Sequence, residues 1–133
     1  MKPAISIIIP VLNEENRINQ ALEQIEAQVF DAAIEIVVAD GHKCGTTLAE
    51  IKNAGVIKVF SPPGRGVQLN AGAAKASGDI LLFLHCDTRL PSGALQSVKK
   101  VLQNPVICAG AFDLAVNSRK RVFRMIEKSA SLR

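Results

Sequence analysis

The stretch GRGVQLNAGAAKASGDILLFLHCDT, residues Gly64–Thr88, decides the fold. It begins with a glycine-punctuated turn, continues through a helix of small residues to a stop at Gly78, and then enters the apolar run Ile80–Leu84. A continuous apolar run of this length is typical of a strand buried on both faces, as in a parallel sheet. Asp87 follows just past the carboxyl end of that strand. Because open α/β sheets bind ligands beyond their carboxyl ends, we expect Asp87 to hold a metal or a polar ligand.

Strand and helix patterns alternate along the rest of the chain. The apolar runs predict strands over residues 5–9, 34–39, 56–60, 80–84 and 106–116. The first strand is expected to end at Pro10, which cannot donate to a ladder. Such alternation predicts an α/β fold, with three layers and a mostly parallel sheet.

Helices are expected between these strands. Asn13 is a suitable N-cap for a first helix, whose apolar stripe would comprise Ile18, Ala21, Leu22, Ile25 and Val29. A second helix would be capped by Thr46 or Thr47, run to about residue 53 and end before Gly55. Further helices are predicted over residues 67–77, from Pro91 to about residue 104 with an apolar face of Leu95, Val98, Val101 and Leu102, and over 118–133.

Composition restricts the class of protein and of ligand. The 133 residues fit one domain, 1–133, and 48% hydrophobic with 21% charged residues indicates a folded core. A net charge of +4 suits an anionic ligand such as a nucleotide diphosphate. The chain has no Trp or Tyr and five Phe, which argues against a base-stacking surface and hence against a nucleic-acid partner.

The cysteines and the N-terminus indicate the compartment. Cys44, Cys86 and Cys108 give an odd count without a CxxC pair, which favours a reducing environment over a disulfide framework. The apolar run near the N-terminus is too short for a signal peptide, and no segment reaches the roughly 20 apolar residues of a membrane span. We therefore expect a cytoplasmic protein.

The C-terminal segment predicts that the chain is truncated. Residues 118–133 are basic, with apolar residues interspersed, and the chain stops at Arg133 inside this helix-like pattern. Such a helix can lie on an anionic membrane surface, expose a solvated face, or begin a longer buried region, and we favour the last. A missing part would expose apolar surface, which predicts self-association into a homo-oligomer.

Three charged residues are candidates for ligand binding. Asp40 and Asp87 each follow a predicted strand, so they are expected at one edge of the sheet. There Asp40 would accept hydrogen bonds from a base or ribose and Asp87 would bind a divalent cation. The alternative is that both acids only cap the loops that follow. Arg65, before a helix N-terminus, favours a diphosphate over the alternative of a solvated loop residue, and Gln68 is interpreted as an exposed helix residue.

Other ligand motifs fit poorly. The phosphate-loop pattern GxxxxGK[ST] does not occur, and the dinucleotide pattern GxGxxG fails because Leu69 occupies its third glycine position. Two His/Cys pairs, His42 with Cys44 and His85 with Cys86, could form a zinc site, but their spacing is not a standard ligand pattern.

Three segments resemble a known family. ISIIIPVLNEE (5–15), EIVVADG (35–41) and GRGVQLNAGAAKASGDILLFLHCDTRLPSGAL (64–95) resemble family 2 of the nucleotide-sugar glycosyltransferases, which have the GT-A fold. The branch most similar is a bacterial one whose metal motif reads LHADT, here LHCDT at 84–88. The resemblance covers about the first 116 residues.

The resemblance implies roles for seven residues in a site for a nucleotide-diphosphate sugar. Asp87 would bind Mg²⁺ or Mn²⁺, Arg65 would lie near the diphosphate, Asp40 near the base and His85 near the ribose. Pro10, Leu12 and Glu14 would line the nucleotide pocket. The loop GHKCGTT at 41–47 lacks the acid usual in the family.

The resemblance also implies an activity, transfer of the sugar to an unknown acceptor by inverting displacement. The acceptor site and the catalytic base would lie beyond Arg133, so no catalytic residue is assigned. The alternative is a non-catalytic nucleotide-binding or assembly module. A nucleotidyltransferase is a third hypothesis, but its glycine-rich motif would be expected near the first strand, where PVLNEE stands.

Overall fold

A computed structural model describes residues 2–113 of the chain. These residues fall into two units, one ending at Val101 and one beginning at Leu102, and each is described by itself. In the second unit, residues 103–113 form neither helix nor strand, so the fifth strand expected over 106–116 is not formed over 106–113. These residues are exposed and join no ladder in the part of the chain that is described. Residues 114–116 and the predicted basic helix 118–133 lie outside the described residues.

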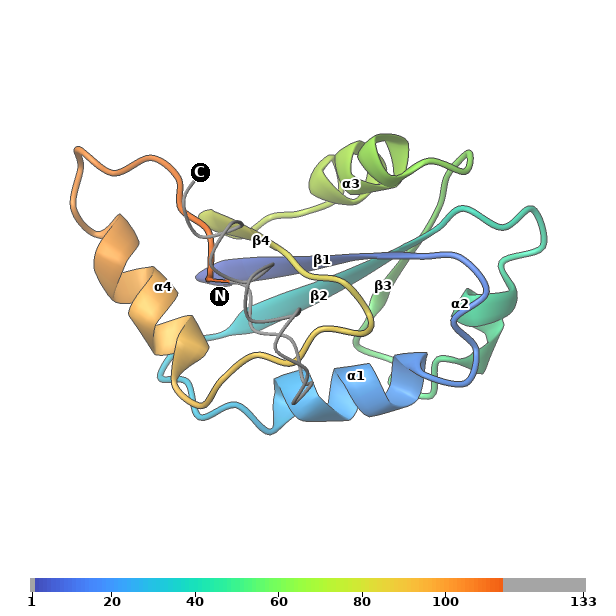
Figure 1. Ribbon diagram of the computed structural model, residues 1–133, viewed down its shortest axis with the longest axis horizontal. Coiled ribbons are helices and arrows are strands. Elements are labelled where there is room, and N and C mark those ends of the chain that lie inside the picture. The colour runs from blue at the N-terminus through green and yellow to red at the C-terminus, as the bar shows by residue number, and fades with distance from the viewer. Residues whose placement is uncertain (1, 114–133) are drawn as a thin grey trace, which may run out of the picture. The chain divides into compact units, whose positions relative to one another are not determined.

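The first unit contains a four-stranded sheet in which all strands are parallel (Figure 1). Its strands are β1 (Ile5–Val11), β2 (Ile34–Asp40), β3 (Ile57–Phe60) and β4 (Ile80–Phe83), in the spatial order β3-β2-β1-β4. The expected parallel α/β architecture is confirmed. The first strand does not end at Pro10: β1 stays paired with β2 as far as Val11, whereas its pairing with β4 stops at Ile8.

Helices cover both faces of this sheet (Figure 1). α1 (Ile18–Glu26), α2 (Thr46–Glu50) and α4 (Ala94–Leu102) belong to one face, and α3 (Arg65–Ala73) belongs to the other. Alternate residues of β1 point to opposite faces, so Ile7 joins the larger core with α1 whereas Ile8 joins a smaller core under α3. Both isoleucines are fully buried.

The strand expected to be buried on both faces is instead an edge strand. β4 pairs with β1 on one side only, and among the described residues no strand pairs with its other side. Leu82 packs into the larger core, but Leu81 and Phe83 point to the opposite face and are 43% and 50% exposed. The reason is that α3 packs chiefly against β1 and β2, which leaves that face of β4 largely uncovered.

The first helix begins later than its sequence pattern predicts. Asn13 is not its N-cap: it adopts a left-handed φ of 57°, and α1 starts at Ile18 after a turn in which the Glu14 carbonyl accepts from the Ile18 N–H. The stripe of Ile18, Ala21, Leu22 and Ile25 is buried as expected. Val29 is 89% exposed, because the helix ends at Glu26 and its periodicity no longer applies there.

Three other helix boundaries also differ from expectation. α2 ends at Glu50, so Gly55 is not its C′ residue. α3 is shifted toward the N-terminus and contains Arg65 in its first turn. α4 starts at Ala94 and not at Pro91, and on its predicted apolar face Leu95 is buried whereas Val101 is 50% exposed.

Gly72 allows α3 to approach the sheet, which makes a matched pair of substitutions informative. A Cβ at Gly72 would lie 2.5 Å from Cγ2 of the buried Ile8, whereas a Cβ at Gly66, in the same helix, would meet nothing within 4 Å. We expect Gly72→Ala to lower the free energy of unfolding by about 1–3 kcal/mol through overpacking. Gly66→Ala should raise it by up to about 1 kcal/mol through helix propensity. Urea unfolding measures both, and equal effects would contradict this packing.

A partly buried polar cluster joins the amino ends of β1 and β2 to the turn before β4 and gives a pH-dependent stability. Glu35 accepts hydrogen bonds from Ser6 Oγ (2.6 Å), Ser77 N (2.8 Å) and Ser77 Oγ (2.9 Å). Burial alone would raise the pKa of Glu35, but these hydrogen bonds to the ionised form hold the pKa below its ordinary value of 4.5. A lowered folded-state pKa stabilises the fold above pH 4.5, and this contribution is lost as the pH falls through the folded-state pKa.

The stability difference between wild type and Glu35→Gln should therefore shrink as the pH falls below about 4.5. Thermal unfolding midpoints of both proteins, measured from neutral pH downward, test this expectation. A difference that stays constant through this range would show that the ionised Glu35 contributes nothing.

Candidate functional site

The carboxyl ends of all four strands lie at one edge of the sheet, because the strands are parallel and in register. The segments that leave this edge are residues 12–17, 41–45, 61–64 and 84–93. They contain four of the seven candidate site residues, and the other three, Pro10, Asp40 and Arg65, lie at the adjoining ends of β1, β2 and α3. This edge is where open α/β sheets bind ligands.

Asp40, the last residue of β2, is fully buried and organises the loop that follows it. Its Oδ1 accepts from His42 N (2.8 Å), and its Oδ2 accepts from Thr47 N (3.1 Å) and Leu48 N (3.4 Å). The carboxylate thus caps the N-terminus of α2, which neither Thr46 nor Thr47 caps. The structure does not leave this carboxylate free for a ligand, so the loop-capping alternative describes it, and its contact with a base stays a prediction.

Thr47 connects this loop to the segment after β1. Its side chain is fully buried, and its Oγ1 accepts from Glu14 N (3.1 Å). The Glu14 carboxylate is partly exposed and lies 3.7 Å from the Arg17 guanidinium. Leu12 is 46% exposed and Pro10 is half-buried. Pro10, Leu12 and Glu14 therefore lie at this edge, and the Thr47 contact holds the backbone at Glu14.

The glycine-rich loop before α3 is held by the side chain of Gln68, a role that was not predicted from the sequence. Arg65 is exposed in the first turn of α3, as a ligand contact requires. Gln68 is only 4% exposed, and the interpretation that it is a surface residue is wrong. Its Nε2 donates to the carbonyls of Val11 (2.7 Å) and Ala39 (2.9 Å), and its Oε1 accepts from Gly64 N (3.4 Å). Its spacing of four from the buried Gly72 is the signal that could have placed it on the buried face.

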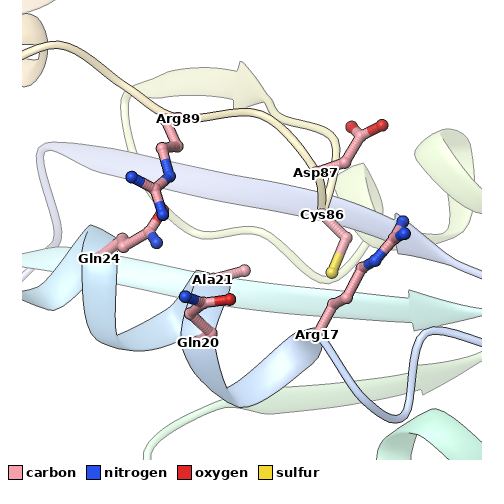
Figure 2. A pocket seen from close by; sticks show the side chains of 7 residues that line it. All are labelled: Arg17, Gln20, Ala21, Gln24, Cys86, Asp87 and Arg89. Atoms are coloured by element: carbon pink, nitrogen blue, oxygen red, sulfur yellow. The ribbon is translucent and has the colours of Figure 1, made fainter. Parts of the chain in front are cut away.

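The segment after β4 presents Asp87 to solvent. Asp87 is exposed, its Oδ1 accepts from Thr88 Oγ1 (3.4 Å), and it forms no ion pair within residues 2–113. Figure 2 shows its carboxylate directed away from α1, whereas the Cys86 thiol points toward that helix. Burial and the negative charges of Glu14 and Asp87 raise the pKa of Cys86 to about 11. His85 is half-buried.

A pocket of about 380 Å³ lies between α1 and the segment after β4 (Figure 2). Its lining is polar apart from one small residue, and consists of Arg17, Gln20, Ala21, Gln24, Cys86, Asp87 and Arg89. Arg17, Gln20 and Gln24 were not singled out from the sequence, and Ala21 was placed only in the buried stripe. The recurrence of these three polar residues at intervals of three and four, beside the buried stripe, is the signal that could have found them.

The zinc alternative receives no support from the described residues. Between residues 2 and 113, no group of three or more His, Cys, Asp or Glu side chains is arranged to hold a metal ion. Cys44, Cys86 and Cys108 are all free thiols.

The parallel sheet and the loops at its carboxyl edge place this chain among the open α/β proteins, which bind their ligands in a crevice at the strand ends. Within that class, the family model "Glycosyl transferase family 2" matches residues 6–129. The chain belongs to this family, and the expectation from the sequence is confirmed. Its assignment to the LHADT branch stays a prediction.

Two curated proteins show the similarity at the level of sequence. The chain is 31% identical over 104 residues to GalNAc(5)-diNAcBac-PP-undecaprenol beta-1,3-glucosyltransferase of Campylobacter jejuni, covering 72% of this chain and 33% of that protein. It is 36% identical over 119 residues to a low-salt glycan biosynthesis hexosyltransferase of Haloferax volcanii, covering 88% and 28%.

A solved structure shows the same fold. Glucosyl-3-phosphoglycerate synthase from Mycobacterium tuberculosis, in complex with Mn²⁺, UDP and glucosyl-3-phosphoglycerate, superposes with a TM-score of 0.57 at 28% identity, covering 71% of this chain and 37% of that one. The GT-A type of fold is thereby confirmed. The chain spans about a third of the length of these three proteins. Among residues 2–113, none of the helices has the length and the apolar character that a membrane span requires.

Proposed function

We propose that this chain binds the nucleotide-diphosphate sugar of a glycosyltransferase at the carboxyl edge of its sheet. The observation that carries the proposal is Asp87, an exposed carboxylate just past β4, at the same edge as Arg65. In a chain of this family, that edge offers an acid for a cation and a base for a diphosphate. The whole protein would transfer the sugar to an acceptor that remains unknown.

The residues present fit a divalent cation held jointly with the donor. Mg²⁺ is usually bound by one or two carboxylates together with substrate phosphates, and not by a cage of protein ligands. Asp87 has the required oxygen ligands, is exposed and is free of ion pairs within residues 2–113. We propose that Asp87 holds Mg²⁺ or Mn²⁺. When bound, the cation would neutralise charge on the departing diphosphate.

The N-terminus of α3 is suited to the diphosphate itself. α3 is nine residues long, so its first turn offers unpaired N–H groups and a positive dipole end, beside the Arg65 guanidinium. Gly64, the N-cap residue of α3, has a φ of 136°, a backbone conformation that favours glycine. A bidentate guanidinium and helix N–H groups are the usual partners of phosphate oxygens.

We assign the nucleoside to the loops after β1 and β2. Pro10, Leu12 and Glu14 would line its pocket, and His85 would face the ribose. The role of Asp40 is to hold the loop at 41–47 through its three backbone acceptor contacts, and a direct contact with the base would require those contacts to rearrange. The free thiols agree with a cytoplasmic location.

The proposed reaction is an inverting displacement at the anomeric carbon. A general base would remove the proton from the acceptor hydroxyl while the oxygen attacks. None of the candidate residues is assigned as that base. The chain's own contribution is to bind and orient the donor.

Two measurements test this function on the full chain. Calorimetry with UDP and GDP, with and without Mn²⁺, should show binding that the cation tightens by at least about tenfold. An assay of sugar release from UDP- and GDP-sugars then separates an enzyme from a non-catalytic nucleotide-binding module. Absence of binding to every nucleotide diphosphate tested would overturn the proposal.

A further inference from the structure

Gln68 is a buried amide that joins three backbone segments at the carboxyl edge. Its Nε2 bridges the carbonyls of Val11 and Ala39, at the ends of the two central strands β1 and β2, with distances of 2.7 and 2.9 Å. Its Oε1 accepts from Gly64 N at 3.4 Å. Both amide hydrogens and one acceptor site are thus used, which a buried glutamine requires.

The same loop is packed closely against the end of β2. A Cβ at Gly41 would lie 3.0 Å from Cδ of Gln68 and 3.0 Å from Cα of Pro63. The loop therefore rests on the strand end without room for a side chain there. Two independent observations, a hydrogen-bond bridge and a close approach at Gly41, fix the loop before Arg65 in one position.

The Gln68 side chain is buried, although its partner Gly64 lies at the surface. Gln68 is 4% exposed, whereas the adjacent Val67 is 47% exposed. At this point of α3, the polar side chain is therefore buried and the apolar one faces solvent. A leucine of similar size would fill this space but would remove both hydrogen bonds to the strand-end carbonyls, leaving the Val11 carbonyl only its bond from Gly41 N at 3.0 Å. The hydrogen bonds of Gln68 to the strand ends and to Gly64 therefore explain why a polar side chain occupies this buried position.

We infer that Gln68 is a positioning residue for the donor diphosphate: it holds the Gly64–Arg65 segment at the strand ends, and so orders the diphosphate site before the ligand arrives. This inference rests on the proposed function. A ligand that binds only the ordered form of a loop has its apparent affinity reduced by the fraction of molecules in that form. Loss of the bridge should therefore weaken diphosphate binding even though Gln68 touches no ligand.

The test compares Gln68→Leu and Gln68→Glu, two substitutions of similar size, with Ser6→Ala as the matched control. Ser6 is also fully buried and polar and also bridges segments, but at the opposite, amino edge, where it donates to Glu35 and accepts from Gly78 N. Gly41→Ala places a methyl group against Gln68 and Pro63 and should displace the same loop. This variant tests the inference if the Gln68 variants fail to fold. Circular dichroism confirms that each variant is folded at the temperature used.

The first readout is nucleotide affinity by calorimetry with Mn²⁺. The Gln68 variants and Gly41→Ala should bind UDP and GDP at least about tenfold more weakly than wild type. Their affinity for UMP and GMP should change by less than about threefold, because these ligands lack the second phosphate. Ser6→Ala should leave all four affinities unchanged while lowering the unfolding midpoint.

The second readout needs no ligand. Trypsin cleavage after Arg65, followed by mass spectrometry and normalised to cleavage after Arg89, should be faster in the Gln68 variants and unchanged in Ser6→Ala. Wild-type cleavage and wild-type UDP affinity in Gln68→Leu would overturn the inference, as would equal losses in Ser6→Ala. If the wild type binds neither UDP nor GDP, the proposed function fails, and the cleavage rates alone decide whether Gln68 orders the loop.

Discussion

Replacing Asp87 with asparagine is expected to abolish the part of nucleotide-diphosphate binding that depends on the cation. Asparagine keeps the size of the side chain, but it replaces one carboxylate oxygen with an NH₂ group and removes the negative charge that favours a hard divalent cation. Calorimetry with UDP and GDP should show that Mn²⁺ no longer tightens binding, a loss on the order of tenfold or more. Binding without Mn²⁺ should change little.

Asp79 offers a matched control for this experiment. It is an exposed acid directly before β4, at the amino edge of the sheet, and it pairs with Lys2. Asp79→Asn makes the same chemical change at the other end of the same strand and should leave the Mn²⁺ effect intact. Retention of the full Mn²⁺ effect in Asp87→Asn, or its loss in Asp79→Asn, would remove Asp87 from the proposed site.

Replacing Asp40 with alanine should be the most destabilising of these substitutions. It would leave the buried N–H groups of Thr47 and Leu48, and the part-buried one of His42, without their acceptor. A buried donor left unpaired costs about 1–3 kcal/mol, so we expect the free energy of unfolding to fall by at least about 3 kcal/mol. Urea unfolding followed by circular dichroism measures the loss.

The same variant separates the two interpretations of Asp40. Asp31→Ala is the control, because Asp31 forms an exposed ion pair with Lys99 at 2.9 Å, and its loss should cost less than about 1 kcal/mol. If Asp40→Ala remains as stable as wild type but loses nucleotide affinity, Asp40 contacts the ligand directly. A large loss of stability supports its role in holding the loop.

The sequence was sufficient for features that depend on hydrophobic pattern. The order of strands and helices, the parallel sheet and the positions of Asp40 and Asp87 at one edge follow from apolar periodicity and from the rule that strand-end loops of a parallel sheet lie together. The buried stripe of α1 was predicted for the same reason. Family membership followed from motifs at these strand ends.

The features that the sequence did not reveal depend on three-dimensional pairing. Gln68 was interpreted as exposed because glutamine usually is, and only its place over the ends of β1 and β2 supplies its partners. Asp40 caps a helix six residues further along the chain, which no local capping rule anticipates. The apolar residues of β4 pointed to a doubly buried strand, although the strand lies at an edge, because hydrophobicity does not report which neighbours a strand has.

The capping of the loop at 41–47 has a consequence for which substitutions this loop tolerates. Asp40 holds this loop through main-chain N–H groups, so its shape does not depend on which side chains it carries at Lys43 and Cys44, both of which point into solvent. A library randomised at these two positions should retain folded members at high frequency. Under the proposed function, substitutions at these two positions would change which donors are accepted without first requiring repair of the scaffold.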